Sequence, residues 1–305
     1  MSNIENLDQI VLQALDFFQQ NQPWNINLDS YSFPFVVGSG NAYNTGTILF
    51  SGRAGIFADE SNFREMITAY DEAIKQKLAT QAIIISASGE KDSVWEIELA
   101  KQSGLSTTLL TCDANSSATK IADQVFTYRK IAEPYTYNTS TYLGMILSAT
   151  GENVNAIQKY IQTLKLPENF DTYDAYSFVL PDRYANICPM LDIKKNELFG
   201  PFTSLRAFPE GHARHAKFII PTEKELVIGI NANIDHFGHP DHRFTLDLPK
   251  EADFGFVLAL TYFITGKIQA SKPSYFKDSI ENYCLDYGPK AYGKEGTFDI
   301  IVPGN

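Results

Sequence analysis

The sequence is poor in cysteine, in positive charge and in long apolar runs, and each shortage excludes a class of protein. Its three cysteines, Cys112, Cys188 and Cys284, have no paired spacing, which argues against a disulfide framework or a thiolate zinc site. Lysine and arginine total 25 against 36 aspartates and glutamates, and this net charge of −11 argues against binding to nucleic acid. No apolar run is long enough to span a membrane, and the acidic N-terminal segment lacks the basic region of a signal peptide. The sequence therefore predicts a cytoplasmic protein that binds neither nucleic acid nor membranes.

Apolar segments of strand length alternate with amphipathic segments through the first half of the chain, a pattern typical of parallel α/β sheets. The clearest is the apolar run Ile83–Ile85, because an unbroken strand of this kind is buried on both faces. It leads into the Ser/Gly turn 86–90, and a helix follows through Val94 and Lys101. We predict strands at 35–37, 56–58, 82–85, 107–111 and 124–128, and helices over about 4–18, 41–50, 63–75 and 94–101.

The second half repeats this alternation less regularly. We predict a helical stretch over 139–164 interrupted near Gly144 and Gly151, a linker at 166–174, helices at 187–199 and 254–264, and strands at 177–180, 218–220, 226–230, 244–248 and 298–302. The predicted fold class is α/β, an αβα sandwich with parallel sheets and two Rossmann-like subdomains in tandem. We expect an N-terminal helix and connector at 1–30, a first subdomain at 31–165 and a second at 175–305.

Two strand–turn–helix corners in the first subdomain carry small and hydroxyl-bearing residues. One strand leads into Gly-Ser-Gly-Asn-Ala-Tyr (38–43) and another into Ser-Ala-Ser-Gly-Glu-Lys (86–91). Backbone N–H groups at a helix start and nearby hydroxyls suit a phosphate, and the carboxyl ends of parallel strands share one edge. We therefore expect a phosphate ligand at this edge, although Lys91 could equally be an ordinary surface lysine. The candidate binding residues are Ser39, Gly40, Asn41, Ser86, Ser88, Gly89 and Lys91.

These two turns resemble the phosphate-binding signatures of the sugar isomerase (SIS) domain family. The segment 113–123 resembles the family's third turn, and Glu133 with Thr139 resembles the stretch that opens its next helix. In the second half, 193–198 and 209–212 are similar to segments of the isomerase domain of glutamine–fructose-6-phosphate amidotransferase and of bifunctional phosphoglucose/phosphomannose isomerases. The resemblance covers roughly residues 30–265 and implies a double-SIS phosphosugar enzyme, usually a homodimer with its active site near the subunit interface. We expect a phosphorylated sugar as the ligand, and no cofactor or metal.

The resemblance also implies the catalytic residues. The family's catalytic glutamate falls at Glu197, and its ring-opening histidine falls at Ala213, so we expect His212 or His215 to take that role. Two departures concern the ligand: Ala42 stands where the family carries a hydroxyl residue, and Lys91 where it carries a threonine.

Local chemistry supports a functional Glu197. On a helix it shares a stripe with Met190 and Ile193, and a carboxylate on an apolar stripe tends toward the raised pKa that a shuttling base requires. Lys194 is a candidate for substrate binding, or else forms an ordinary surface pair with Glu197.

Two further groups of residues are weaker candidates. Lys290 and Lys294 lie where related amidotransferases carry a substrate-contacting lysine, although the local pattern differs. His236, His239 and His242 lie among Gly238 and Pro240, which exclude a regular helix, so we expect a polar loop and not a metal site.

These residues predict a phosphosugar aldose–ketose isomerase that acts through an enediol(ate), with Glu197 as proton shuttle. Cleavage of a C–N bond, as in fructosamine-6-phosphate deglycases or amino-sugar phosphate deaminases, uses closely related chemistry and stays open. A non-catalytic phosphosugar-binding regulator is a third possibility.

Overall fold

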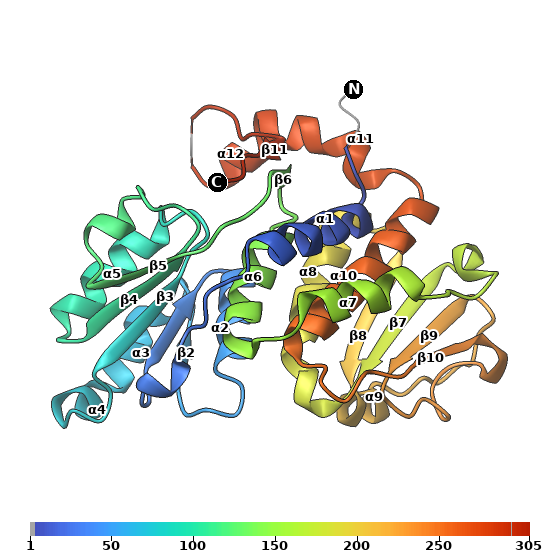
Figure 1. Cartoon of the computed structure of the whole chain (residues 1–305), viewed down its shortest axis with the longest axis horizontal. Coiled ribbons are helices and arrows are strands. Elements are labelled where there is room, and N and C mark those ends of the chain that lie inside the picture. Colours follow the sequence, from blue (N-terminus) through green and yellow to red (C-terminus); the bar gives the residue numbers. More distant parts are fainter. Residues whose placement is uncertain (1–3, 294) are drawn as a thin grey trace. The chain divides into compact units, whose positions relative to one another are not determined.

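The computed structural model describes residues 4–293 and 295–305, which form two compact units (Figure 1). The five-strand unit comprises Gln20–Ile131, Ser140–Gly151 and Gly304–Asn305. The four-strand unit comprises Ala132–Thr139, Glu152–Pro303 and the described part of Met1–Gln19. No helix within the described residues combines the length and apolar character needed to cross a bilayer.

The five-strand unit is built on a parallel sheet with the order β2-β1-β3-β4-β5. Phe35, Ile84 and Leu109 on one face of the sheet pack against Phe63, Ile74 and Ile97 of the helices α3, α4 and α5. On the other face, Gly46 of helix α2 approaches Val36 so closely that an added Cβ would lie 2.7 Å from its Cγ1. The strands are β1 (Phe35–Gly38), β2 (Ile56–Ala58), β3 (Gln81–Ile85), β4 (Ser106–Thr111) and β5 (Gln124–Thr127), and the helices are α2 (Asn41–Leu49), α3 (Phe63–Ala69), α4 (Asp71–Lys75), α5 (Asp92–Gln102) and α6 (Thr139–Thr150).

The four-strand unit contains a second parallel sheet with the order β10-β9-β7-β8. A short antiparallel ribbon pairs β6 (Glu133–Pro134) with β11 (Ile301–Val302). The strands of the sheet are β7 (Ala175–Leu180), β8 (Ser204–Pro209), β9 (Glu225–Ile230) and β10 (Arg243–Leu246), and the helices are α1 (Leu7–Gln20), α7 (Val154–Thr163), α8 (Cys188–Phe199), α9 (Glu210–Ala216), α10 (Phe254–Ser271), α11 (Tyr275–Asn282) and α12 (Gly288–Ala291). The two mostly parallel sheets flanked by helices confirm the predicted α/β class with tandem subdomains.

Several predicted elements differ from the structure. The predicted strand 218–220 is wrong, because this segment forms no strand and Ile219 and Ile220 are 84% and 76% exposed. The strand that pairs with β7 at the edge of the sheet is β8, which was not predicted. The interruption predicted near Gly144 is also wrong: α6 continues through it and ends before Gly151, whose φ of 65° breaks the helix. The predicted helix 63–75 is divided at Tyr70 into α3 and α4.

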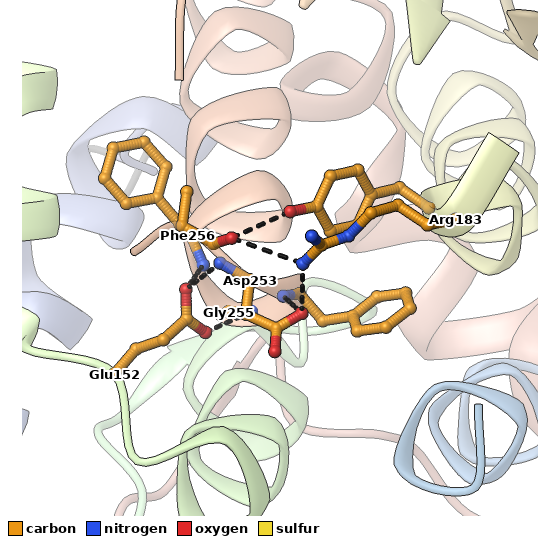
Figure 2. A network of polar contacts seen from close by, with 8 residues as sticks. Glu152, Arg183, Asp253, Gly255 and Phe256 are labelled. Carbon is orange, nitrogen blue, oxygen red and sulfur yellow. Dashed lines mark hydrogen bonds and ion pairs between the residues drawn. The ribbon is translucent and has the colours of Figure 1, made fainter. Parts of the chain in front are cut away.

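The N-terminus of α10 is closed by side chains from two other segments of the same unit (Figure 2). The Glu152 carboxylate, in the loop before α7, accepts hydrogen bonds from the backbone N–H groups of Asp253 (2.7 Å), Gly255 (2.7 Å) and Phe256 (3.0 Å). The Asp253 side chain accepts from the N–H of Phe254 and forms an ion pair with Arg183 at 3.0 Å. The first N–H groups of a helix have no partner within it, so these carboxylates satisfy them and offset the positive end of the helix dipole.

Candidate active site

The predicted phosphate-binding residues lie at one edge of the five-strand sheet. Strand β2 lies on one side of β1, whereas β3, β4 and β5 lie on the other, so the order of the sheet reverses between β1 and β3. This is the position at which open α/β sheets bind their ligands, beyond the carboxyl ends of the strands. Gly38 and Ile85 pair across β1 and β3, and the turns 39–41 and 86–91 therefore begin side by side.

The turn 86–91 is held by hydrogen bonds within itself. The N–H of Gly89 donates to the Ser86 hydroxyl at 3.1 Å, and the N–H of Glu90 donates to the Ser88 hydroxyl at 3.4 Å. Each hydroxyl oxygen acts as an acceptor here, so its own hydrogen can still be donated to an anion. Gly89 has a φ of 60°, and a Cβ at this position would lie 2.0 Å from the Ser116 hydroxyl, so the turn requires glycine.

The third predicted turn is bound directly to the second. The Glu90 carboxylate accepts a hydrogen bond from the N–H of Ser117 at 2.8 Å, and the carbonyl of Gly89 accepts one from the N–H of Ala118 at 2.9 Å. Sequence reasoning did not assign a role to Glu90. Its position in the turn was visible in the motif, but its contact with residues 27 positions further along the chain was not.

The turn before α2 contains one buried amide. Gly40 has a φ of 56°, and the residue Asn41 next to it is 9% exposed. The Asn41 Oδ1 atom has no hydrogen-bond partner among the described residues. A buried amide oxygen in this state can accept a hydrogen bond from a hydroxylated ligand. Ser39 is half-buried beside it.

Acidic groups surround the first turns of α5. Burial, together with the neighbouring charges of Asp92, Glu60 and Asp59, raises the pKa of Glu96 to about 8. Lys91 is the last residue of the turn 86–91, where it is exposed and supplies a positive charge. Its φ is 58°.

The four-strand unit contains the predicted catalytic glutamate in a buried ion pair. On α8, the Lys194 Nζ lies 2.5 Å from Glu197 Oε2 and 2.7 Å from the carbonyl oxygen of Thr136. The Lys194 side chain is 0% exposed and that of Glu197 is 22% exposed, so this is not an ordinary surface pair. Burial raises the pKa of the Glu197 carboxyl, and the charge of Lys194 opposes that rise.

The segment 135–138 forms part of the surroundings of this pair. Thr136 and Asn138 have φ values of 76° and 48°, which are uncommon for residues other than glycine. The Thr136 hydroxyl is buried without a hydrogen-bond partner among the described residues. Sequence reasoning missed Thr136, since no local pattern indicates a threonine in this conformation.

The structure does not bring the predicted histidines to Glu197 within one chain. Helix α9 directly follows β8, so His212 and His215 lie beyond the carboxyl edge of the sheet, where both are exposed. Glu197 lies near the end of α8, which returns to the amino edge before β8 begins. The six residues of β8 separate these edges by roughly 20 Å. Ala213, between the histidines, is buried in the apolar core.

The weaker candidates occupy other places. Lys290 forms an ion pair with Asp286, and Lys294 lies outside the described residues. His242 Nδ1 lies 2.9 Å from the Tyr173 hydroxyl. Across residues 4–293 and 295–305, no group of three or more histidine, cysteine or acidic side chains is arranged to hold a metal.

Comparison with known proteins identifies the fold. No protein-family model and no curated protein sequence matches the chain. Among solved structures, glucosamine-6-phosphate deaminase from Thermotoga maritima matches with a TM-score of 0.55 and 15% identity, over 87% of this chain and 92% of that one. The C-terminal domain of glucosamine-fructose-6-phosphate aminotransferase from Francisella tularensis matches with a TM-score of 0.54 and 13% identity, over 87% and 92%. Tagatose-6-phosphate ketose/aldose isomerase from Escherichia coli matches with a TM-score of 0.54 and 13% identity, over 87% and 90%. The chain thus has the SIS-type double-domain fold that these proteins share.

Proposed function

We propose that this protein is an aldose–ketose isomerase that acts on a phosphorylated sugar. The observation that carries the proposal is the buried pair of Lys194 and Glu197, because a largely desolvated carboxylate held by one ammonium group is suited to moving a proton. The solved structures with this fold include a protein named as a ketose/aldose isomerase and one named as a phosphosugar deaminase.

The proposed reaction transfers one proton between adjacent carbons. Glu197 removes the proton from C2 of the open-chain aldose, which gives an enediol(ate), and returns it to C1. The proton of the C2 hydroxyl passes to the C1 oxygen, which leaves the ketone at C2. Burial raises the pKa of Glu197 and so makes it a stronger base, while the positive charge of Lys194 limits that rise. The Thr136 hydroxyl is a candidate donor to the developing oxyanion, since it is buried and has no partner among the described residues.

The proposed phosphate site is formed by the two Ser/Gly turns of the five-strand unit. The hydroxyls of Ser86 and Ser88 and the backbone at Ser39 and Gly40 would bind the phosphate oxygens, and Lys91 would add a charge-assisted hydrogen bond. This arrangement compensates for a net charge of −11, which by itself repels an anionic substrate.

Ring opening requires a second acid or base, and we assign it to His212 or His215 of a second subunit. Within one chain these histidines and Glu197 lie at opposite edges of the same sheet. A homodimer in which α9 of one subunit meets α8 of the other would place a histidine beside the substrate. The proposed function therefore needs the proposed homodimer.

Incubation of the protein with phosphorylated hexoses in deuterated water tests this function. The panel contains fructose-6-phosphate, glucose-6-phosphate, mannose-6-phosphate and glucosamine-6-phosphate, and NMR follows deuterium at C1 and C2. Deuterium uptake that Glu197→Gln abolishes supports the proposal. The matched control is Glu98→Gln, which changes an exposed glutamate on α5.

Two outcomes would contradict the isomerase proposal. Ammonia release from glucosamine-6-phosphate, with no exchange in the other sugars, would indicate a deaminase. Thermal stabilisation by one of the sugars without any exchange would indicate a protein that binds phosphosugars without converting them.

A further inference from the structure

A pocket of about 480 Å³ lies in the five-strand unit, away from the Ser/Gly turns. Gln81 and Gln124, which line it, are the first residues of β3 and β5. Because the strands are parallel, these residues mark the amino edge of the sheet, whereas the Ser/Gly turns follow its carboxyl edge. The remaining wall comes largely from the connector before β1, including Trp24, Asn25 and Tyr31.

The face of the sheet beneath this pocket carries three polar side chains at its amino edge. Ile83 pairs with Thr108, and Thr108 pairs with Gln124, so these side chains face the same side. Gln81 lies two residues before Ile83 and shares that side. The Tyr31 hydroxyl lies 3.3 Å from the Thr108 hydroxyl and 3.4 Å from Gln124 Oε1, which fixes the phenol at the floor of the pocket.

Trp24 forms an aromatic wall that is already held in place. Its ring centroid lies 4.5 Å from that of Phe126 and 5.4 Å from that of Tyr128, in tilted and stacked geometries. Trp24 is nevertheless 39% exposed. An indole supported by other rings and still accessible offers an apolar surface on which a flat ligand can stack at a small cost in side-chain entropy.

The hydrogen-bonding groups of the pocket are all neutral. Its lining residues include four amide side chains and no charged side chain. Within the described residues, the side chains of Asn25 and Gln81 make no hydrogen bond, so their donors and acceptors can serve a ligand. Amides placed around a stacking surface suit a ring that carries hydroxyls on its rim. A nucleotide would bring a phosphate to a pocket that offers it no cation.

We propose that this pocket binds a neutral hydroxylated ring, an unphosphorylated monosaccharide, stacked on Trp24 and hydrogen-bonded to Asn25, Gln81 and Gln124. The site is independent of the proposed isomerase function, because no residue of the pocket belongs to the Ser/Gly turns or to the Glu197 pair. Given the small size of such a ligand, we expect a dissociation constant on the order of 1 mM.

The tryptophan content of the chain makes the test simple. The sequence has two tryptophans, Trp24 and Trp95, so the variant Trp95→Phe leaves Trp24 as the single indole reporter. We expect titration of this variant with glucose, fructose or N-acetylglucosamine to change Trp24 fluorescence in a saturable way. The change should persist in saturating fructose-6-phosphate, which would occupy the proposed phosphosugar site.

Variants of the amides test the assignment of residues. In the Trp95→Phe background, Gln81→Leu or Gln124→Leu should each weaken binding about 3- to 10-fold through the loss of a hydrogen bond. Gln102→Leu, at an exposed position outside the pocket, should leave binding unchanged. Thermal unfolding of each variant shows whether it is folded.

The proposal is overturned if none of the three sugars changes the fluorescence, or if the amide variants and the control bind equally well. Loss of the signal in saturating fructose-6-phosphate would mean that the sugar occupies the phosphosugar site instead. Saturable binding of adenosine in place of any sugar would show that the ligand class is wrong.

Discussion

Burial removes much of the hydration of Glu197 and raises its pKa, and the charge of Lys194 opposes that rise. If Lys194 is replaced by methionine, burial raises the pKa of Glu197 without opposition. A general base acts only when deprotonated, so the isomerisation rate should fall as pH decreases through this pKa. We expect this acid limb to lie at higher pH in Lys194→Met than in the wild-type protein, in profiles of kcat/KM against pH. An unchanged limb in a folded variant would show that Lys194 does not control the base.

Substitution of the base itself should have a larger effect. Glu197→Gln keeps the shape of the side chain but cannot accept a proton, and we expect the rate to fall by about 10²- to 10⁴-fold, as for other general bases. The variant should still bind the phosphorylated sugar, and the rise in melting temperature that the sugar causes measures this binding. If turnover survives in this variant, another residue is the base.

The raised pKa of Glu96 predicts how the free energy of unfolding changes with pH. Its folded-state pKa is raised to about 8 from an ordinary value of 4.5, so between these pH values the folded protein binds more protons than the unfolded chain. Stability should therefore decrease as pH rises from 4.5 to 8, and the full penalty is present above pH 8. We expect Glu96→Gln to raise the free energy of unfolding by roughly 2–4 kcal/mol at high pH and to change it little at pH 4.5. Urea unfolding at both pH values measures this, and an equal gain at both would contradict it.

Sequence reasoning reached some of these residues and could not reach others. Glu197 and Lys194 became candidates because the segment 193–198 is similar to a segment of the SIS family, and their catalytic roles stay predictions. The burial of Lys194 depends on its contact with the carbonyl of Thr136, 58 residues away in the sequence, so it could not be read from the motif. The raised pKa of Glu96 comes first from its burial and then from nearby charges, among them Glu60 and Asp59 of a different strand–helix connection, so it too could not be read from the local sequence.

At the scale of elements, the N-terminus of α10 offers a prediction. Three backbone N–H groups donate to the Glu152 carboxylate, so Glu152→Ala should lower the free energy of unfolding by about 1–3 kcal/mol. Glu152→Gln keeps an oxygen acceptor without the charge and should lose less. Added sulfate should restore part of the stability of Glu152→Ala in thermal melts, because an anion can take the place of the carboxylate. Equal melting temperatures for all three proteins would contradict this account.

The strands that were predicted correctly are stabilised by burial of their own apolar residues, whereas the missed strand is stabilised by contacts with residues distant in the sequence. Strand β3 is visible in the sequence because its own apolar run is buried on both faces. Strand β8 was missed because Arg206 interrupts its apolar pattern. The Arg206 guanidinium pairs with Glu225 on β9 and donates a hydrogen bond to the Ser177 hydroxyl on β7, and it lies over the ring of Phe218. These partners become adjacent only after the sheet has formed, so no local signal could reveal them.

At the scale of the whole molecule, the proposed isomerase needs two chains to complete one site. A protein with Glu197→Gln and a protein with His212→Ala and His215→Ala should each be nearly inactive alone. Mixed after reversible dissociation, they should recover roughly a quarter of wild-type activity if subunits pair at random, since half of the dimers then contain one intact site. Size-exclusion chromatography measures whether the mixed chains form dimers, and the deuterium-exchange assay measures the activity that they recover. A mixture no more active than its components would place the histidine and the glutamate of one site in the same chain, or would exclude the histidines from the reaction.

The Glu152 cap of α10 also bears on how the protein responds to its surroundings. A carboxylate on the same chain is an intramolecular ligand, and its effective concentration exceeds that of free phosphate or sulfate in solution. Glu152 therefore occupies the backbone N–H groups at the start of α10 at any anion concentration, so we expect changes in dissolved phosphate to leave this helix start unaffected. Under the function proposed above, sensing of phosphorylated metabolites is then left to the Ser/Gly turns of the five-strand unit.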